Sequence, residues 1–181
     1  FQHAPSFPFE VILVDNGSPN QEEVQALAKA WEGKVTFVPL PTNTGYHGGN
    51  EAGFQKATGE YFMTVNPDTE VGPGTLDGLI SYMDSHTDIG IIGPRLRYPD
   101  GTIQDSYRRF MTITDQVIKR LSFLHPLPAV KKRMHHYLMW NVNPDDVQEV
   151  DWIVGTAMVI RKEAYEKIGG YDLRYFLFMG D

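Results

Sequence analysis

The chain has 181 residues, of which 41% are hydrophobic and 12% aromatic, and it contains no cysteine. This composition suits one globular domain with a substantial core, and it excludes disulfide frameworks, thiolate metal sites and cysteine catalysis. The formal net charge of -7 argues against general nucleic-acid binding, because an acidic surface repels phosphate groups.

The first predicted element is a strand over residues 11–14, a continuous apolar run typical of a strand that is buried on both faces. It ends in a polar turn, residues 15–17. Asn20 and Glu23 then stand at the spacing of a capping box, which predicts the start of a helix. Its apolar positions recur at helical spacing: Val24, Leu27, Ala28 and Trp31.

The alternation of strands and helices continues along the chain. The patterns predict a strand over 34–40, a helix over 50–57, a strand over 60–65, a helix around 76–83 and a strand over 89–94. A hairpin turn is expected around Asp100 and Gly101. Strands that alternate with helices predict parallel pairing through right-handed crossovers. We therefore expect an α/β fold with a mixed, mostly parallel sheet flanked by helices.

The alternation weakens from about residue 104 to residue 148, where the chain becomes basic and aromatic. We interpret this segment as an insertion, a flap or a docking surface, within a single domain that spans residues 1–181. Regular structure is expected to return with a strand that runs through Ile160 and a helix over 162–168, which a Gly-Gly pair at 169–170 ends.

Polar residues follow three of the predicted strands, and ligands of open α/β sheets bind beyond the carboxyl ends of strands. Asp15 follows the first strand, the glycine-rich stretch 42–50 follows the second, and the turn of residues 66–68 follows the third. In this turn Pro67 cannot continue a sheet ladder, so its polar neighbours extend from the tip of the strand. Carboxylate and amide oxygens are ligands that Mg²⁺ prefers, often shared with substrate phosphates.

Five stretches of the chain, in this order, resemble the inverting family-2 glycosyltransferases with the GT-A fold, in particular the rhamnosyltransferase-like branch. They are VILVDNGS, NTGYHGGN, VNPDTE, VGTAMVIRKEA and GGYDLRYFLFMGD. The resemblance spans most of the chain and describes residues 104–148 least. It implies a GT-A-type, Rossmann-like fold. It also implies transfer of a sugar from dTDP-rhamnose or a UDP-sugar to a saccharide hydroxyl, with inversion, in cell-surface polysaccharide synthesis.

The resemblance assigns the first two stretches to the nucleotide-sugar donor. Asp15 falls where the family's aspartate hydrogen-bonds the pyrimidine base; the alternative is a turn or helix-cap aspartate. Asn43, Gly45 and Asn50 fall in the loop that wraps the nucleotide. His47, in the same loop, is either a solvated residue or a phosphate contact.

The resemblance also supplies a metal ligand and a catalytic base. Asp68 matches the metal-binding aspartate of the family's D-x-D motif, with Asn66 in place of the first acid, and the implied ion is Mg²⁺ or Mn²⁺. The ion would stabilise the leaving diphosphate. Asp181 aligns with the aspartate that deprotonates the acceptor, and Gly180 stands where the family usually has a glutamate.

On the acceptor side the resemblance points to the stretch that begins at Asp151. Asp151 and Trp152 are expected to line the acceptor sugar site, where an indole ring offers an apolar face to a pyranose. Gly155 would keep the strand close to the ligand. Trp152 fits a place in the core nearly as well.

The expected partners are a nucleotide-sugar donor and a saccharide or lipid-linked saccharide acceptor, without nucleic acid. The lack of cysteine and of an apolar run of roughly 20 residues fits a cytoplasmic chain. The basic insertion would add a peripheral contact with the inner face of the cell membrane. The absence of an initial methionine and the end at Asp181 suggest a fragment of a longer protein.

Two alternatives stay open at this point. One is a non-catalytic or degenerate transferase-like binding module. The other is a nicotinamide-dependent oxidoreductase, because an aspartate at a strand end can contact ribose, although the chain lacks the G-x-G-x-x-G fingerprint.

Overall fold

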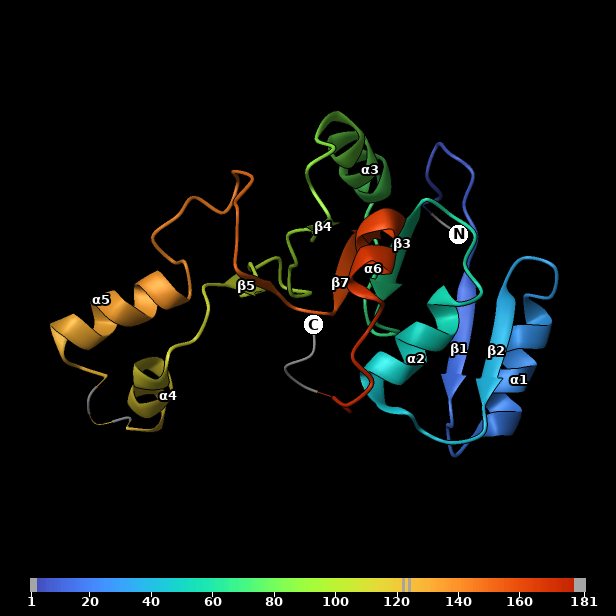
Figure 1. Cartoon of the computed structure of the whole chain (residues 1–181), viewed down its shortest axis with the longest axis horizontal. Coiled ribbons are helices and arrows are strands. Elements are labelled where there is room, and N and C mark those ends of the chain that lie inside the picture. Colours follow the sequence, from blue (N-terminus) through green and yellow to red (C-terminus); the bar gives the residue numbers. More distant parts are fainter. Residues whose placement is uncertain (1–2, 122, 124, 178–181) are drawn as a thin grey trace. The chain divides into compact units, whose positions relative to one another are not determined.

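The chain divides into two compact units in the computed structural model (Figure 1). The model describes residues 3–121, 123 and 125–177. The first unit joins residues 1–93 to residues 155–181, and the second is residues 94–154. The basic segment 104–148 therefore lies wholly within the second unit. The single domain stays a prediction, because compactness alone does not decide how many parts fold independently.

The first unit opens with two parallel strands joined by a helix. They are β1 (Ile12–Asn16), α1 (Gln21–Ala30) and β2 (Thr36–Leu40), with Ile12 opposite Thr36 and Asn16 opposite Leu40. This pairing confirms the predicted parallel crossover. The apolar residues of β1 are only partly buried, not buried on both faces as the sequence predicted. Among the described strands, β1 has β2 as its only hydrogen-bonded neighbour.

Helix α1 begins without the capping box that its sequence predicted. Asn20 occupies the N-cap position, but its side chain makes no capping hydrogen bond to the backbone. Its Nδ2 instead donates to the Glu23 carboxylate at 3.4 Å. Two acids in the first turn, Glu22 and Glu23, still stabilise the helix through its dipole.

The first unit also holds a second sheet, in which β7 lies between two other strands. Its strands are β3 (Tyr61–Val65), β4 (Ile91–Ile92) and β7 (Ala157–Arg161). Strand β7 runs antiparallel to both neighbours. The chain reaches β7 from the second unit and not through a crossover helix of this sheet, so nothing forces parallel pairing here. The predicted mixed α/β class is confirmed, with more antiparallel pairing than the alternation of elements suggested.

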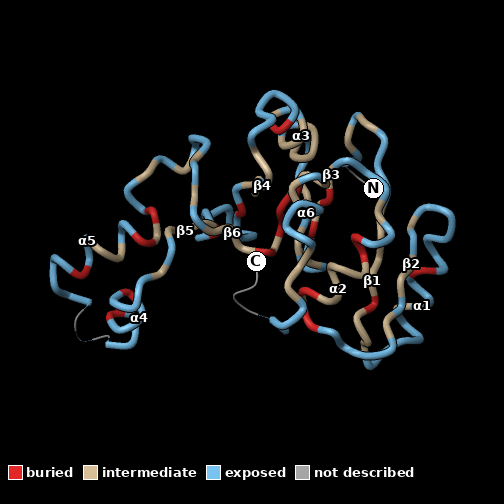
Figure 2. Tube along the Cα trace, in the orientation of Figure 1, coloured by how far each residue is buried: buried red, intermediate tan, exposed pale blue. Residues whose placement is uncertain are grey.

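The core of the first unit forms around β7, whose residues 157–160 are all buried (Figure 2). One cluster gathers side chains from α2, β3, β7 and α6: Phe54, Phe62, Met158, Ile160 and Tyr165. Burial of each such side chain contributes roughly 1.5–3 kcal/mol. The cluster fixes helix α2, which begins near the candidate site, against the second sheet.

Three helices complete the first unit, and all are short. They are α2 (Gly45–Phe54), α3 (Thr75–Ser85) and α6 (Lys162–Ile168). Gly169 ends α6 with a φ of 82°, as the predicted Gly-Gly stop requires. Among the described residues, no helix combines the length and the apolarity needed to cross a membrane.

The second unit contains regular structure that the sequence patterns missed. Strands β5 (Tyr107–Arg108) and β6 (Trp152–Ile153) pair antiparallel. Between them lie two helices, α4 (Ile113–Arg120) and α5 (Pro128–Tyr137).

A capping box and an ion pair join the two helices of the second unit. The Thr112 hydroxyl accepts from the Asp115 backbone N–H at 3.2 Å, and the Thr112 N–H donates to the Asp115 carboxylate at 2.8 Å. Arg133 Nε of α5 donates to Asp115 Oδ1 at 2.6 Å. Burial raises the pKa of Asp115, but the bonds from Thr112 and Arg133 outweigh it and leave this pKa below its ordinary value. The pair fixes α4 against α5.

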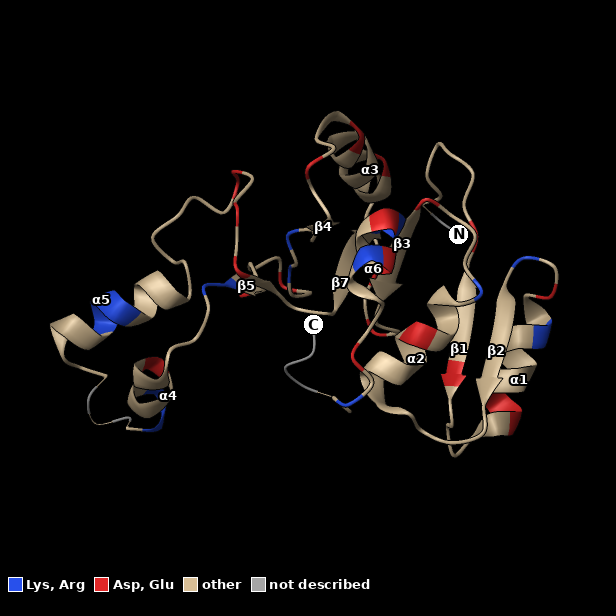
Figure 3. Ribbon diagram, viewed as in Figure 1, with Lys and Arg blue, Asp and Glu red and all other residues tan. Residues whose placement is uncertain are grey.

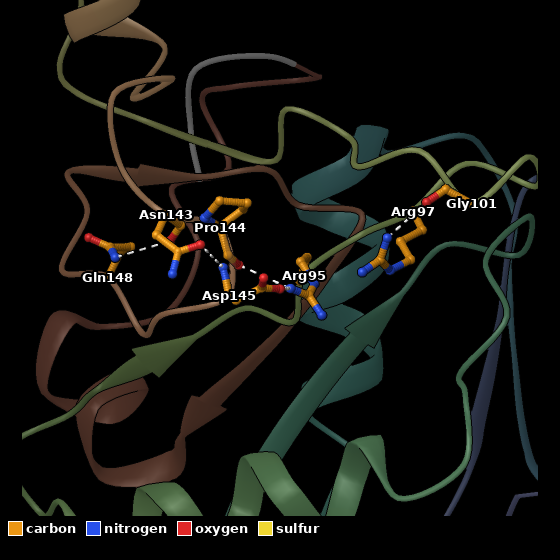
Figure 4. Close-up of polar contacts among 7 residues, drawn as sticks. All are labelled: Arg95, Arg97, Gly101, Asn143, Pro144, Asp145 and Gln148. Carbon is orange, nitrogen blue, oxygen red and sulfur yellow. Dashed lines mark hydrogen bonds and ion pairs between the residues drawn. The ribbon is translucent and has the colours of Figure 1, made fainter.

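The predicted hairpin turn at the start of the second unit is confirmed. Arg97 and Ile103 form an antiparallel bridge, and Gly101 takes a φ of 84° in the turn. Arg97 Nη1 also donates to the Gly101 carbonyl at 2.8 Å (Figure 4).

The segment before β6 is fastened by Arg95 (Figure 4). Its Nη1 donates to the Pro144 carbonyl at 3.2 Å and pairs with the Asp145 carboxylate. Asn143 Oδ1 accepts from the Asp145 N–H at 3.2 Å. These contacts close a polar loop within the second unit.

Candidate active site

The carboxyl ends of β1, β2 and β3 lie on the same side of the first unit, because the three strands point the same way (Figure 1). The predicted donor residues are therefore on segments that begin at one edge. Asp15 is 3% exposed, and its Oδ1 accepts from the Ser18 N–H at 2.9 Å. This bond closes the turn after β1, as a turn aspartate would. Recognition of a base by Asp15 stays a prediction.

Asn16, beside Asp15, is the residue that joins β1 to the loop after β2. Its Nδ2 donates to the Gly45 carbonyl at 2.8 Å, and its Oδ1 accepts from the Thr44 N–H and hydroxyl at 2.9 and 2.8 Å. Asn43 Oδ1 lies 3.3 Å from the same Nδ2 and accepts from the Gly45 N–H at 2.8 Å. No role for Asn16 in a binding site follows from the sequence pattern.

Position 17 requires a glycine, because the backbone of the loop after β2 passes close to it. Gly17 has a φ of 70°, and a Cβ there would lie 2.5 Å from the backbone nitrogen of Asn43. The turn after β1 therefore packs directly on the loop after β2.

The glycine-rich stretch is a helix and not the loop that the sequence predicted. Helix α2 begins at Gly45 and ends at Phe54, whereas the pattern predicted a helix over 50–57. Gly45 does have the positive φ expected of this stretch, 78°, but the group that approaches it is the Phe176 carbonyl of the chain itself. Asn50 lies within the helix, and its Nδ2 donates to the Tyr46 carbonyl at 3.0 Å.

Tyr46 extends the site toward the second sheet. Its hydroxyl donates to the Gly155 carbonyl at 2.5 Å. The next carbonyl along the chain, that of Thr156, accepts from the Asn66 N–H at 2.9 Å. A continuous set of contacts thus runs from Asn16 through α2 to the turn after β3. We call this set the polar rim: Asn16, Asn43, Thr44, Gly45, Tyr46, Gly155, Thr156 and Asn66.

The turn after β3 presents an exposed carboxylate at the rim. The Thr69 N–H donates to the Asn66 carbonyl at 3.0 Å and closes the turn around Pro67. Asp68 is exposed, and its Oδ1 accepts a long 3.5 Å bond from the Thr69 hydroxyl. An exposed carboxylate in a turn that also carries an asparagine fits a hard divalent ion that shares its coordination with a diphosphate. Among the described residues no group of three or more His, Asp or Glu gathers as a metal cluster.

His47 is buried, so the prediction of a solvated loop histidine is wrong. It is 0% exposed, and its Nδ1 lies 2.6 Å from the Tyr175 carbonyl oxygen. The ring packs on Tyr46 and Tyr171 at centroid distances of 5.4 and 5.3 Å. Its Nε2 is buried without a hydrogen-bond partner among the described residues. Burial follows from the helical start of α2, which turns residue 47 away from solvent.

Glu51, one turn further along α2, holds the same carboxy-terminal segment. It accepts from the Tyr165 hydroxyl, from Gln55 Nε2 at 2.8 Å and from the Tyr171 N–H at 3.2 Å. Burial raises the pKa of Glu51, but these bonds outweigh it and lower the pKa below its ordinary value. Burial, together with the hydrogen bond to the Glu51 carboxylate, raises the pKa of Tyr165.

The segment of residues 171–177 therefore lies against the start of α2. Tyr46 N–H donates to the Phe176 carbonyl at 2.8 Å, which adds a third contact to those of His47 and Glu51. Asp181, the predicted catalytic base, lies outside the described residues, as does Gly180. The three contacts hold residues 171–177, the last described part of the chain, against the start of α2.

The predicted acceptor residues fall in both units. Asp151 and Trp152 are in the second unit, whereas Gly155 is part of the rim in the first. Asp151 Oδ2 accepts from the Phe110 N–H at 3.0 Å. The Arg108 guanidinium lies over the Trp152 ring at 5.1 Å, so one face of this indole is already in contact with the protein. Acceptor binding by the three residues stays a prediction.

Comparison with known proteins identifies the family of this chain. The model of glycosyl transferase family 2 matches residues 2–169. The match covers most of the chain, so the chain belongs to this family. The resemblance drawn from the five stretches is thereby confirmed.

Three proteins are similar to this chain over parts of their length. An N-acetylglucosaminyl-diphospho-decaprenol L-rhamnosyltransferase of Mycobacterium tuberculosis is 27% identical over 186 residues, which cover 96% of this chain and 59% of the relative. The O-antigen biosynthesis protein RfbC of Myxococcus xanthus is 27% identical over 92% of this chain and 12% of its own length. An undecaprenyl-phosphate 4-deoxy-4-formamido-L-arabinose transferase of Pectobacterium atrosepticum is 34% identical over 45% of this chain and 26% of its own. The chain spans less than two thirds of these relatives.

Proposed function

We propose that this chain is the catalytic part of an inverting rhamnosyltransferase. The donor is dTDP-rhamnose, with a UDP-sugar as the alternative donor. The acceptor is a saccharide linked to a polyprenyl diphosphate, at the cytoplasmic face of the cell membrane, in the synthesis of a cell-surface polysaccharide. The activity of the mycobacterial relative supports rhamnose and a diphospho-polyprenol-linked acceptor, and that of the Pectobacterium relative supports a polyprenyl carrier. The family match argues against the nicotinamide-dependent alternative.

The polar rim is the observation that carries this proposal. It connects the ends of β1 and β3 through α2 with hydrogen bonds of 2.5–2.9 Å. Residues that bind one ligand must be held in fixed relative positions, because a loose site loses the benefit of orientation. Asp15 would accept from the pyrimidine ring N–H, Asn43, Gly45 and Asn50 would enclose the nucleotide, and Asp68 would face the diphosphate.

The reaction is a single displacement at the anomeric carbon. Asp181 accepts the proton of the acceptor hydroxyl. At the same time the hydroxyl oxygen bonds to the anomeric carbon, and the bond from that carbon to the diphosphate oxygen breaks. Asp68 and Asn66 would hold Mg²⁺ or Mn²⁺, which supplies charge stabilisation for the leaving dTDP. Asp151, Trp152 and Gly155 would orient the acceptor sugar.

Activity assays on the full-length protein test the proposal. Product should form from dTDP-rhamnose and a polyprenyl-diphosphate-linked saccharide, and chelation of divalent ions should reduce the rate. Asp181→Asn should lower kcat by about 100-fold or more while donor affinity persists. Asp68→Asn should weaken donor affinity in the presence of Mn²⁺.

The exposed Asp88→Asn serves as the matched control for both substitutions and should leave the rates unchanged. A protein that binds the donor but forms no product with any acceptor would favour the non-catalytic alternative. Full activity of Asp181→Asn would remove Asp181 from the mechanism.

A further inference from the structure

The charge of the chain is distributed unevenly. Residues 107–140 carry seven lysines and arginines and a single acidic residue, Asp115, in a chain whose formal net charge is -7. These basic residues belong to the second unit and cluster on and around α4 and α5 (Figure 3). A local positive surface on an acidic protein selects for an anionic partner.

The same region exposes large apolar side chains. Helix α4 presents Ile113 and Val117, which are 83% and 50% exposed and lie four residues apart on one face. Phe110, Phe123 and Leu127 flank the helices and are 73%, 73% and 50% exposed. We call this set the hairpin face, after the pair of packed helices α4 and α5: Phe110, Ile113, Val117, Phe123 and Leu127.

The hairpin face is not the side of α4 that packs on α5. Asp115 and Ile118 are the buried residues of α4, and Asp115 pairs with Arg133 of α5. Ile113 and Val117 each lie two residues from Asp115, so they project on another side of the helix. Exposed apolar side chains grouped in this way mark a contact surface.

Helices α4 and α5 also carry exposed basic side chains. Arg133 donates hydrogen bonds to Asp115 and Thr112. Lys119, Arg120, Lys131 and Lys132 are exposed. Lys131 and Lys132 also line a hollow of about 510 Å³, together with His135, His136 and Asn141.

We propose that the hairpin face and these four basic residues form a docking surface for an anionic lipid bilayer. Apolar side chains of a short amphipathic helix enter the headgroup boundary, while lysines and arginines bind lipid phosphates. A protein partner is disfavoured, because exposed lysines are depleted in protein interfaces. Docking would bring the enzyme to the surface that carries a lipid-linked acceptor; that consequence rests on the proposed function, whereas vesicle binding does not.

Vesicle co-sedimentation of the whole protein tests the proposal. The protein should bind vesicles that contain phosphatidylglycerol, bind phosphatidylcholine vesicles much more weakly, and dissociate as salt increases. Lys131→Gln with Lys132→Gln should lower the partition coefficient about 30-fold, which corresponds to about 1 kcal/mol for each charge. Ile113→Ser with Val117→Ser should lower it about tenfold or more.

Matched controls come from the first unit. Lys29→Gln with Lys167→Gln removes two charges, and Leu27→Ser removes an apolar side chain that is 52% exposed. Neither should change vesicle binding. Rate measurements with a soluble, short-chain acceptor should be the same for the hairpin-face variants and the unmodified protein, which separates docking from catalysis.

Equal binding to neutral and anionic vesicles, or unchanged binding by both pairs of variants, would overturn the docking surface. Self-association that Ile113→Ser with Val117→Ser abolishes, without vesicle binding, would assign the face to a second copy of the chain and also overturn it. Loss of transferase activity in every protein, with vesicle binding intact, would instead count against the proposed function alone.

Discussion

His47 Nδ1 lies 2.6 Å from the backbone carbonyl oxygen of Tyr175, 128 residues further along the chain. A carbonyl oxygen only accepts hydrogen bonds, so Nδ1 carries the proton of this contact. The His47 ring is fully buried and packs on Tyr46 and Tyr171, although Tyr175 itself is partly exposed. The bond ties the start of α2 to the segment that leads toward Asp181.

Loss of this bond should loosen residues 171–177. His47→Ala should speed tryptic cleavage after Arg174, whose side chain is exposed, and should lower the free energy of unfolding by about 1–3 kcal/mol. If the segment positions the catalytic base, kcat should fall more than donor affinity. Asn places an amide donor near the position of Nδ1, so His47→Asn should restore part of both effects.

His86 provides the matched control for the His47 substitution. Its Nδ1 also lies near a carbonyl oxygen, that of Tyr82 at 2.9 Å, but within one helix and at an exposed position. His86→Ala should leave cleavage after Arg174 unchanged. Unaltered cleavage in His47→Ala, despite a loss of stability, would show that the bond does not hold the segment.

Asn16 should matter more for donor binding than its place beside Asp15 suggests. Asn16→Ala removes the bonds to Thr44 and Gly45 that connect β1 to the start of α2. We expect donor affinity to fall about tenfold, because the loop would no longer be held in the binding geometry. Isothermal titration with dTDP measures this change. Asn20 is an exposed asparagine whose side chain contacts Glu23 at 3.4 Å, so the control variant Asn20→Ala should bind dTDP normally. Equal effects of the two variants would contradict the role of Asn16.

The sequence predicted the elements whose residues repeat with a clear local period. The strand-helix-strand start, the third strand and the helix after β7 follow from such patterns, since their apolar spacing reflects burial on one face. The start of α2 does not follow, because four glycines among its ten residues give it a weak intrinsic preference for helix. Tertiary contacts, such as the bond from Tyr46 N–H to Phe176, stabilise it instead.

The candidate site was predictable only where its residues follow strand ends. Asp68 could be located because it follows β3 directly and is exposed, whereas Asp15 was placed at the correct end of β1 but lies within the strand and is buried. The contacts of Asn16 and His47 join positions 29 and 128 residues apart, and a local pattern carries no information on such pairs. The capping box, which is a local pattern, was expected at Asn20 but formed at Thr112.

Glu51 should make the stability of the protein depend on acid pH. Its hydrogen bonds to Tyr165, Gln55 and Tyr171 lower its pKa in the folded state below the ordinary value of 4.5. Because the pKa is lower in the folded state, the charged Glu51 contributes its full stabilisation above pH 4.5. This contribution is lost as the pH falls through the pKa of Glu51 in the folded state. Glu51→Gln should therefore be less stable than the unmodified protein at pH 7, with a difference that shrinks below pH 4.5.

Urea unfolding at a series of pH values measures this difference. Tyr165→Phe removes one donor to the carboxylate, so it should reproduce part of the loss, and the double variant should lose less than the sum of the two. Additive effects would mean that Glu51 and Tyr165 do not act through their mutual bond. A difference that stays constant with pH would contradict the role of the Glu51 charge.

Gly45 should be far less tolerant of alanine than a glycine of similar backbone conformation. Gly45 and Gly74 have φ values of 78° and 70°, but a Cβ at Gly45 would lie 2.0 Å from the Phe176 carbonyl oxygen, whereas a Cβ at Gly74 meets nothing within 4 Å. Gly74→Ala should cost only the strain of a left-handed alanine, about 1–2 kcal/mol. Gly45→Ala must also displace the backbone of residues 171–177, so we expect a loss of about 3 kcal/mol or more in urea unfolding. Gly45→Ala should also accelerate tryptic cleavage after Arg174, as His47→Ala does. An equal loss of unfolding free energy in the two variants would show that Phe176 does not pack against the start of α2.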